Sequence, residues 1–376
     1  MAQPNSKNAI PYLLDMDGLG ALISALVRQG RQVIGPSLAD DAVIYDDIDS
    51  IADLPAGWGA DQSAGHYRLK RRDDQALFGY GLAPQGWKRQ LYPPRQKLFA
   101  ARRQDSGFAV EPPPPPPPPL ALIGVRACEL AAIDRQAKVF GDRSYADPGY
   151  QSRLANAFIV AVQCAEAQAT CFCAAMGTGP EVSHGYDIKL TEIFVQKHHG
   201  FVAEAGTPQG AKLLKALKAP AAGAAEIKAA GLAVKNAARQ DKHLDAEAAR
   251  KLSAQPDHPR WDKVAERCLS CGNCTMVCPT CFCTTVEDVT DLKGDNAERW
   301  RKWDSCFTMD FSYIHGGAVR TETRSRYRQW ITHKLSTWVD QFGEQGCVGC
   351  GRCTTWCPVG IDITEEAAAI TGQERI

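Results

Sequence analysis

Two runs of cysteines near the C-terminus carry the clearest chemistry in this sequence. The first run spans residues 268–279 and the second spans residues 347–358, and both follow the spacing C-x2-C-x2-C-x3-C-P. Bacterial ferredoxins use this spacing to hold 4Fe–4S clusters through cysteine thiolates. Zinc sites built from four cysteines use separated C-x2-C pairs instead. Two such runs in one chain therefore favour two 4Fe–4S clusters over zinc.

The fourth cysteine of each run is expected to ligate the cluster of the other run. In two-cluster ferredoxins, three closely spaced thiolates take three corners of one cube, and the cysteine before proline is carried to the other cube. The expected ligands of cluster 1 are Cys268, Cys271, Cys274 and Cys357. The expected ligands of cluster 2 are Cys347, Cys350, Cys353 and Cys278. By analogy with other metal sites, we expect the crossed segment to need its clusters in order to fold.

Seven of the fifteen cysteines lie outside the two runs. Four of them fall in the N-terminal half, at Cys128, Cys164, Cys171 and Cys173. Cys128 and Cys164 each follow closely on an apolar segment, so neighbouring strands would bring them together. The four thiols could then hold a third 4Fe–4S cluster, or they are ordinary buried thiols, and spacing alone leaves both open.

The other three cysteines outside the runs are Cys281, Cys283 and Cys306. Three thiolates could form an incomplete metal site. A position in the core or beside a cluster is the favoured interpretation, and the sequence assigns them no role.

The elements that must position the N-terminal cysteines are expected to form an α/β domain over residues 1–204. The apolar segments 120–125 and 157–162 predict buried strands, and residues 129–140 between them predict a helix. Apolar strands that alternate with helices indicate an α/β layer. Nearer the N-terminus, helical spacing is predicted over residues 19–28, with short strands at 31–35 and 41–45.

The rest of the chain is expected to be mainly helical, which makes the fold class α+β. Residues 205–258 are rich in alanine and lysine and predict a helical, solvent-facing connector. Residues 259–376 predict an α-helical ferredoxin domain with two clusters, and helices are expected at 300–307 and 326–342. Gly272 and Gly351 each follow a second ligand, where the backbone must pass close to sulfide.

Two further features have a structural and a functional interpretation. Pro112 to Pro119 is an unbroken proline run, which predicts polyproline II; a surface spacer is favoured over a ligand for a proline-binding module. Arginines also gather at positions 320, 324, 326 and 328. A solvated face is favoured for them over compensation of cluster charge or docking of a partner.

The bulk composition argues against nucleic acid and membrane partners. Lysine plus arginine number 43, as do aspartate plus glutamate, so the formal net charge is zero. The N-terminus lacks a basic start followed by an apolar core, and no apolar run reaches the ~18 residues expected of a spanning helix. Cysteines in such a chain favour metal ligation over disulfides, and we expect a cytoplasmic location.

No flavin or nucleotide fingerprint is found in this chain. The segments that begin at Gly79 and Gly177 each start like G-x-G-x-x-G, but Pro84 and Val182 stand where the last glycine belongs. There is also no cysteine pair of the kind that holds a NiFe site. We therefore expect neither a flavin nor a nucleotide in this chain, and we assign no catalytic residue.

Three motifs give the chain a family resemblance. Residues 124–133 (GVRACELAAI), 170–180 (TCFCAAMGTGP) and 268–284 resemble the β subunit of cytoplasmic NiFe sulfhydrogenases. They are also similar to the iron–sulfur subunit of anaerobic sulfite reductase, a close relative. The resemblance spans roughly residues 70 to 370. The proline run is not part of the pattern.

The resemblance implies an electron-transfer subunit. Its partners would be a subunit that binds flavin and NAD(P) and the small and large subunits of a NiFe hydrogenase, or else the subunits of a sulfite reductase. It also implies cysteine-bound clusters beyond the ferredoxin pair, which favours the third site. We expect the chain to relay single electrons in a hydrogenase complex, with sulfite reductase as the second choice. A non-catalytic scaffold with structural clusters is the remote alternative.

Overall fold

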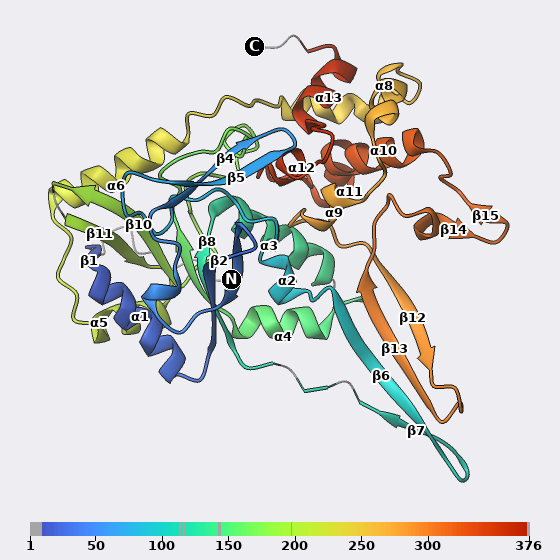
Figure 1. Ribbon diagram of the computed structural model, residues 1–376, viewed down its shortest axis with the longest axis horizontal. Helices are drawn as coiled ribbons and strands as arrows, with labels where there is room; N and C mark the ends of the chain where they lie inside the picture. The colour runs from blue at the N-terminus through green and yellow to red at the C-terminus, as the bar shows by residue number, and fades with distance from the viewer. Residues whose placement is uncertain (1–9, 113, 116, 142–143, 197, 374–376) are drawn as a thin grey trace.

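A seven-stranded mixed sheet forms the centre of the molecule (Figure 1). The computed structural model describes residues 10–112, 114–115, 117–141, 144–196 and 198–373. The sheet order is β1-β11-β10-β9-β8-β2-β3, and β10, β9, β8 and β2 run parallel to one another. The strands are β1 (Tyr12–Leu14), β2 (Gln32–Ala39), β3 (Ala42–Asp47), β8 (Leu120–Val125), β9 (Phe158–Val162), β10 (Ile188–Val195) and β11 (His198–Ala205). The expected α/β layer and its buried strands are thus present.

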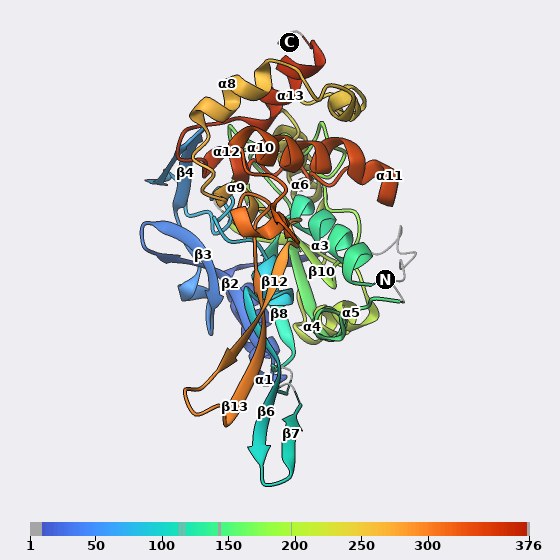
Figure 2. The ribbon, with the colours of Figure 1, turned by 90° about the vertical axis from the view of Figure 1, so that its right-hand side faces the viewer.

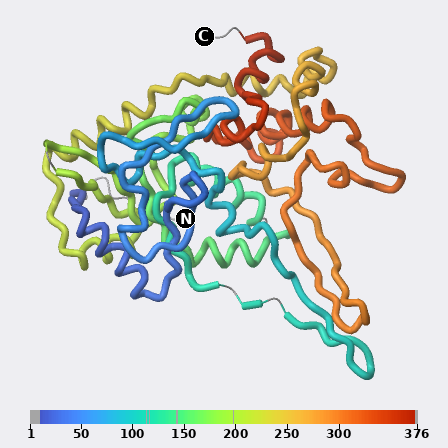
Figure 3. The backbone as a smooth tube through the Cα atoms, viewed as in Figure 1, coloured from blue at the N-terminus to red at the C-terminus, as the bar shows by residue number. Residues whose placement is uncertain are grey.

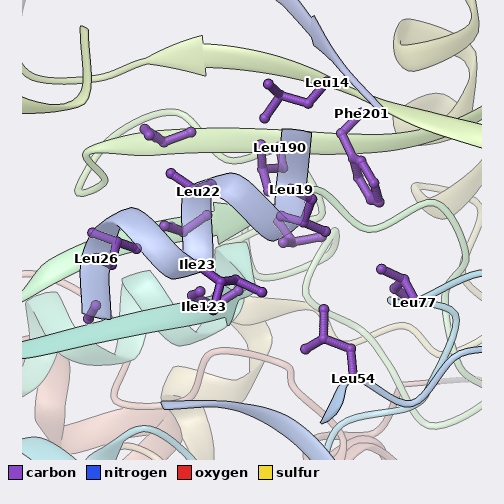
Figure 4. Close-up of a cluster of buried hydrophobic side chains, with 14 of the residues drawn as sticks. Leu14, Leu19, Leu22, Ile23, Leu26, Leu54, Leu77, Ile123, Leu190 and Phe201 are labelled. Carbon is purple, nitrogen blue, oxygen red and sulfur yellow. The ribbon is translucent and has the colours of Figure 1, made fainter. Parts of the chain in front are cut away.

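Helices cover both faces of this sheet. On one face, α1 (Met16–Arg28) and α5 (Pro208–Ala216) pack over side chains such as Ile123 of β8 (Figure 4). On the other face, α3 (Ala127–Phe140) and α4 (Pro148–Asn156) pack over Leu122 of the same strand. Successive strand residues point to opposite faces, so an entirely apolar strand can serve two cores.

The predicted helices of the N-terminal half are confirmed. Helix α1 begins where the Asp15 side chain accepts a hydrogen bond from the Gly18 backbone N–H at 2.8 Å. Its buried side chains recur at helical spacing, at Leu19, Leu22, Ile23 and Leu26. The predicted helix 129–140 corresponds to α3, which starts two residues earlier and therefore includes Cys128 in its first turn.

The connector is helical, as predicted, but it is not simply solvent-facing. It contains α5, α6 (Ala224–Ala237), α7 (Ala246–Ala249) and a 3-10 turn η2 (Arg250–Ala254). Ala230 of α6 packs against Ile193 and Val202 of the sheet, and Leu252 lies in the core of the C-terminal segment. The alanine-rich face of α6 therefore lies against the sheet, because small side chains allow close approach.

A four-stranded sheet projects from the body as an arm (Figure 2). Its order is β12-β13-β6-β7, formed by β6 (Arg95–Gln104), β7 (Gly107–Glu111), β12 (Thr284–Thr290) and β13 (Asn296–Trp303). Strands from the first hundred residues therefore pair with strands between the two cysteine runs, as the side-by-side cyan and orange tubes show (Figure 3). The prediction of a helix over 300–307 was wrong, because β13 pairs on one side with a hairpin partner and on the other with distant β6.

The C-terminal segment is mainly helical around the cysteine runs. Its core contains Trp261, Trp330, Ile331, Leu335 and Ile363. The predicted helix 326–342 is confirmed, with a π-helical turn η4 (His333–Thr337) in its middle. The helices of this segment are α8 (Arg260–Arg267), α9 (Asn273–Met276), α10 (Thr323–Thr332), α11 (Trp338–Phe342), α12 (Arg352–Thr355) and α13 (Ile363–Thr371).

Short elements complete the described chain. They are η1 (Ile51–Asp53), α2 (Lys88–Leu91), η3 (Met309–Ser312) and the hairpins β4 (Trp58–Ser63) with β5 (His66–Arg71) and β14 (Tyr313–Ile314) with β15 (Gly317–Ala318). In the proline run, residues 113 and 116 lie outside the described residues, and its other prolines belong to no helix or strand. Among the helices described, none combines the length and apolar character needed to cross a membrane.

Candidate iron–sulfur sites

The two cysteine runs share one backbone path. Gly272 and Gly351 both adopt left-handed conformations, at φ 76° and 75°, and each precedes a one-turn helix, α9 or α12. Two residues earlier, Ser270 and Gly349 also have positive φ, at 51° and 62°. Glycine adopts such angles without the strain that a Cβ introduces. The predicted need for glycine after the second cysteine is therefore confirmed.

The four cysteines expected at cluster 1 line a single cavity. These residues are Cys268, Cys271, Cys274 and Cys357, and the cavity wall also includes Phe307, Tyr327 and Trp330. Cys357 reaches the cavity from the second run, which is the expected crossing. Burial raises the pKa of Cys274, and the thiols of Cys306, Cys268, Cys357 and Cys271 raise it further. Such a set of thiols ionises together only with cationic iron among them.

The four cysteines expected at cluster 2 also come together. Burial raises the pKa of Cys353, and Cys347, Cys350 and Cys278 raise it further, in that order. Burial also raises the pKa of Cys347 to about 12. Here Cys278 crosses from the first run. Cys353 additionally lines the cavity of the first set, so the two sets adjoin.

The four N-terminal cysteines gather at the carboxyl ends of β8 and β9. These strands are parallel neighbours, so Cys128 in the first turn of α3 lies near Cys164, as the sequence predicted. Burial raises the pKa of Cys128, and Cys173, Cys350 and Cys164 are among the groups that raise it further. Burial also raises the pKa of Cys171, and Cys173 and Cys164 add to this effect.

Two cationic or polar groups face this third set. The Arg126 guanidinium lowers the pKa of Cys164 against the larger effect of burial, which raises it. Gln240 donates a hydrogen bond from Nε2 to Cys173 Sγ at 3.2 Å. A helix N-terminus and an arginine both stabilise thiolates, so this environment suits an anionic cluster as well as the ferredoxin runs do.

The second set lies directly against the third. The Phe172 backbone N–H donates to the Gly349 carbonyl at 2.9 Å, and a Cβ at Gly349 would stand 2.6 Å from the Phe172 carbonyl carbon. A Cβ at Gly351 would stand 2.4 Å from the Thr170 carbonyl oxygen. The Cys171–Phe172–Cys173 segment therefore needs glycine at both positions of the second run.

A buried ion pair spans the same junction. Arg352 Nη2 lies 2.6 Å from Glu129 Oε1, and the two side chains are 0% and 1% exposed. Glu129 also accepts a hydrogen bond from Trp87 Nε1 at 3.0 Å, and Arg352 donates from Nε to the Ala83 carbonyl at 2.7 Å. The residues that follow Cys128 in sequence and precede Cys353 are thus bound to each other. No sequence signal pairs these two residues, because they are 223 residues apart.

The three unassigned cysteines do not form one group. Cys281 lies against Cys278, and a hydrogen bond from its thiol, followed by the Lys334 charge, holds the pKa of Cys278 well below its usual range. Cys306 instead faces Cys283, and burial raises the pKa of Cys306 to about 12. The favoured interpretation, core or cluster-adjacent thiols, agrees with these positions.

A lysine that sequence reasoning missed lies between these thiols. Lys334 is 4% exposed, and its Nζ lies 3.1 Å from Cys278 Sγ. The signal was present, because Lys334 follows Trp330 and Ile331 by four and three residues and so shares their buried helical face.

The arginine group does not form a uniform solvated face. Arg326 is 6% exposed and donates to the Arg320 and Thr321 carbonyl oxygens and to Ser270 Oγ. Arg324 lies 3.3 Å from Asp262. Arg326 thereby supports the turn of the first cysteine run.

The donor sets fit 4Fe–4S clusters better than single ions. Within the described ranges, no three or more His, Cys, Asp or Glu side chains converge closely enough to hold one metal ion. In a cubane each thiolate binds a different iron atom, so four sulfurs around a space are the required arrangement.

Comparison with known proteins agrees with this geometry. Residues 267–361 match the family described as a 4Fe-4S dicluster domain. The chain is also 32% identical over 285 residues to sulfhydrogenase 2 subunit beta of Pyrococcus furiosus, a match that covers 73% of this chain and 82% of that protein. The chain belongs to the sulfhydrogenase β subunit family. This membership confirms the resemblance given by the three sequence motifs. No solved structure matches the chain.

Proposed function

We propose that this chain is the electron-transfer subunit of an NAD(P)-linked NiFe hydrogenase complex in the cytoplasm. It relays single electrons through three 4Fe–4S clusters. The observation that carries the proposal is the grouping of twelve of the fifteen cysteines into three adjoining sets of four. A zinc-stabilised or disulfide-stabilised fold has no use for three adjoining sets of this kind.

The order of the sets supports a relay. Cys271 of the first set is exposed, and Leu269 beside it is 64% exposed. The second set lies between the other two, because Cys353 faces Cys274 and Cys350 faces Cys128. An electron that enters at the surface set therefore reaches the N-terminal set through the middle one. Each step moves one electron, and the cluster that gives it up is oxidised as the next is reduced.

The partners follow from what the chain lacks. It has no nucleotide fingerprint, so a separate flavin subunit would split the hydride of NAD(P)H into single electrons. The matched relative is named as a sulfhydrogenase subunit, which favours NiFe hydrogenase small and large subunits over sulfite reductase subunits as the other partners.

The first test is the iron and acid-labile sulfide content of the anaerobically purified chain. We expect about twelve iron atoms, four for each cubane. About eight would restrict the clusters to the two ferredoxin-type sets and leave Cys128, Cys164, Cys171 and Cys173 as structural thiols. Zinc without sulfide would overturn the relay.

A second test separates the relay from a scaffold. The complex purified through a tag on this chain should contain a flavin subunit, and NAD(P)H should reduce the clusters as seen by EPR. Clusters that dithionite reduces but NAD(P)H does not, in a complex that retains flavin, would favour the scaffold.

A further inference from the structure

Lys334 places a buried positive charge on one ligand of the second set. Its Nζ lies 3.1 Å from Cys278 Sγ and 3.1 Å from Thr280 Oγ1, and Thr280 Oγ1 lies 3.2 Å from the same sulfur. Since the Thr280 oxygen accepts from the lysine, its own proton is available to the sulfur. The sulfur therefore has an ammonium and a hydroxyl as donors.

No carboxylate balances this ammonium. Among the described residues, Lys334 takes part in no ion pair, and the groups that stabilise its charge are the thiols of Cys278, Cys281 and Cys347. A buried ammonium without an anionic partner is costly. The anion that suits this position is the thiolate-bound cluster itself.

The backbone is built to deliver the lysine there. Lys334 lies in the π-helical turn η4, and the Gly346 N–H donates to its carbonyl at 2.9 Å, directly before the second run begins. A π turn shifts the helix face by a fraction of a turn and recurs at functional sites.

We propose that Lys334 is a positioning residue that raises the reduction potential of cluster 2 through its charge and its contact with Cys278. This inference rests on the proposed function, because a cluster must occupy the second set. Reduction adds one negative charge to the cluster, and a fixed ammonium beside a ligand sulfur favours the reduced form. Lys334 keeps its proton throughout, so no further reactant is needed. The middle set then holds the electron between the two ends of the relay.

The first set lacks this device. Cys357 is the counterpart of Cys278, and Val359 and Gly360 occupy the places of Thr280 and Cys281. In the part of the chain that the structure describes, no side chain donates a hydrogen bond to Cys357 Sγ. Removal of the Lys334 charge should consequently change one potential and leave the other.

The test is an EPR redox titration of the loaded chain with Lys334→Met and Lys334→Gln. We expect the Lys334→Met cluster 2 signal to titrate at lower potential, with at least a tenfold lower ratio of reduced to oxidised cluster at a fixed poise. A tenfold change is about 59 mV for a one-electron couple. Lys334→Gln keeps a neutral donor and should fall between wild type and Lys334→Met. The Cys271→Ala variant, which removes an exposed ligand of cluster 1, assigns the signals.

Lys189→Met is the matched control. Lys189 is 9% exposed and pairs with Glu204 at 3.1 Å on the central sheet, so its loss tests the removal of a buried lysine as such. Unchanged potentials in Lys334→Met, or an equal shift in Lys189→Met, would overturn the inference while the clusters still support the relay. A wild-type chain without iron and sulfide would overturn both.

Discussion

The two cysteine runs have one backbone path and two different environments. The first run lies at the surface, with Cys271 exposed and Leu269 64% exposed. The second run is packed against the N-terminal domain, where Arg352 is fully buried and Gly349 touches the Cys171–Cys173 segment. One motif therefore serves as a surface contact in one place and as a junction in the other. What differs is the residues between the cysteines, not the cysteines themselves.

The largest difference is expected from loss of one ligand in each run. Cys350→Ala should leave little folded chain, because Cys350 faces both its own set and Cys128 of the third. Ligand binding at structural metal sites can contribute on the order of 10 kcal/mol to folding. Cys271→Ala should instead yield folded protein that lacks about four iron atoms. Soluble yield, iron content and the thermal midpoint measure both, and equal damage would contradict the contrast.

The buried ion pair gives the next largest effect. Arg352→Met leaves Glu129 as an uncompensated buried charge, and such a loss costs about 3–5 kcal/mol of unfolding free energy. Asn273, the counterpart in the first run, donates to the Trp356 carbonyl at 3.3 Å from an exposed position. Asn273→Ala should therefore cost no more than about 1 kcal/mol. Denaturant unfolding of the loaded chain compares the two.

The double variant Arg352→Met with Glu129→Met sharpens this result. Both charges are then absent, so most of the lost stability should return. If the double variant is as unstable as Arg352→Met alone, the remaining hydrogen bonds of the two side chains matter more than their charges.

The left-handed residue before the second cysteine tests packing in the two runs. Ser270 already tolerates φ 51°, whereas a Cβ at Gly349 would stand 2.6 Å from Phe172. Gly349→Ser should lower the free energy of unfolding by about 2–3 kcal/mol, through strain and overpacking. Ser270→Gly should change it by no more than about 0.5 kcal/mol. Similar values for the two would mean that φ alone decides, and that the contact with Phe172 gives way.

The sequence predicted the local parts of this molecule well. The spacing of the runs, the apolar strands 120–125 and 157–162 and the helices 19–28 and 129–140 depend on neighbours in the chain, and all of these elements are present. The crossing of Cys278 and Cys357 was available by analogy, and the structure brings them to the opposite sets.

The parts that failed are set by distant partners. Residues 300–307 have no local reason to prefer a strand, and β13 forms because β6, from a distant part of the chain, pairs with it. The same holds for Arg352 with Glu129. Lys334 differs, since its place on a buried helical face could have been derived, but the thiols that it faces could not.

The smallest predicted effect concerns a single hydroxyl group. Thr280→Val removes the neutral donor to Cys278 while it keeps the side-chain shape, and Thr280 is completely buried. We expect the potential of cluster 2 to fall by about half as much as in Lys334→Met, since neutral hydrogen bonds are roughly half as strong as charge-assisted ones. The reciprocal change, Val359→Thr, adds a hydroxyl at the matching position of the first set and should raise the potential of cluster 1. EPR titration measures both shifts. If Thr280→Val moved the potential as far as Lys334→Met, the shape of the turn that Thr280 and Lys334 hold, rather than the charge, would be the cause of the difference between the two runs.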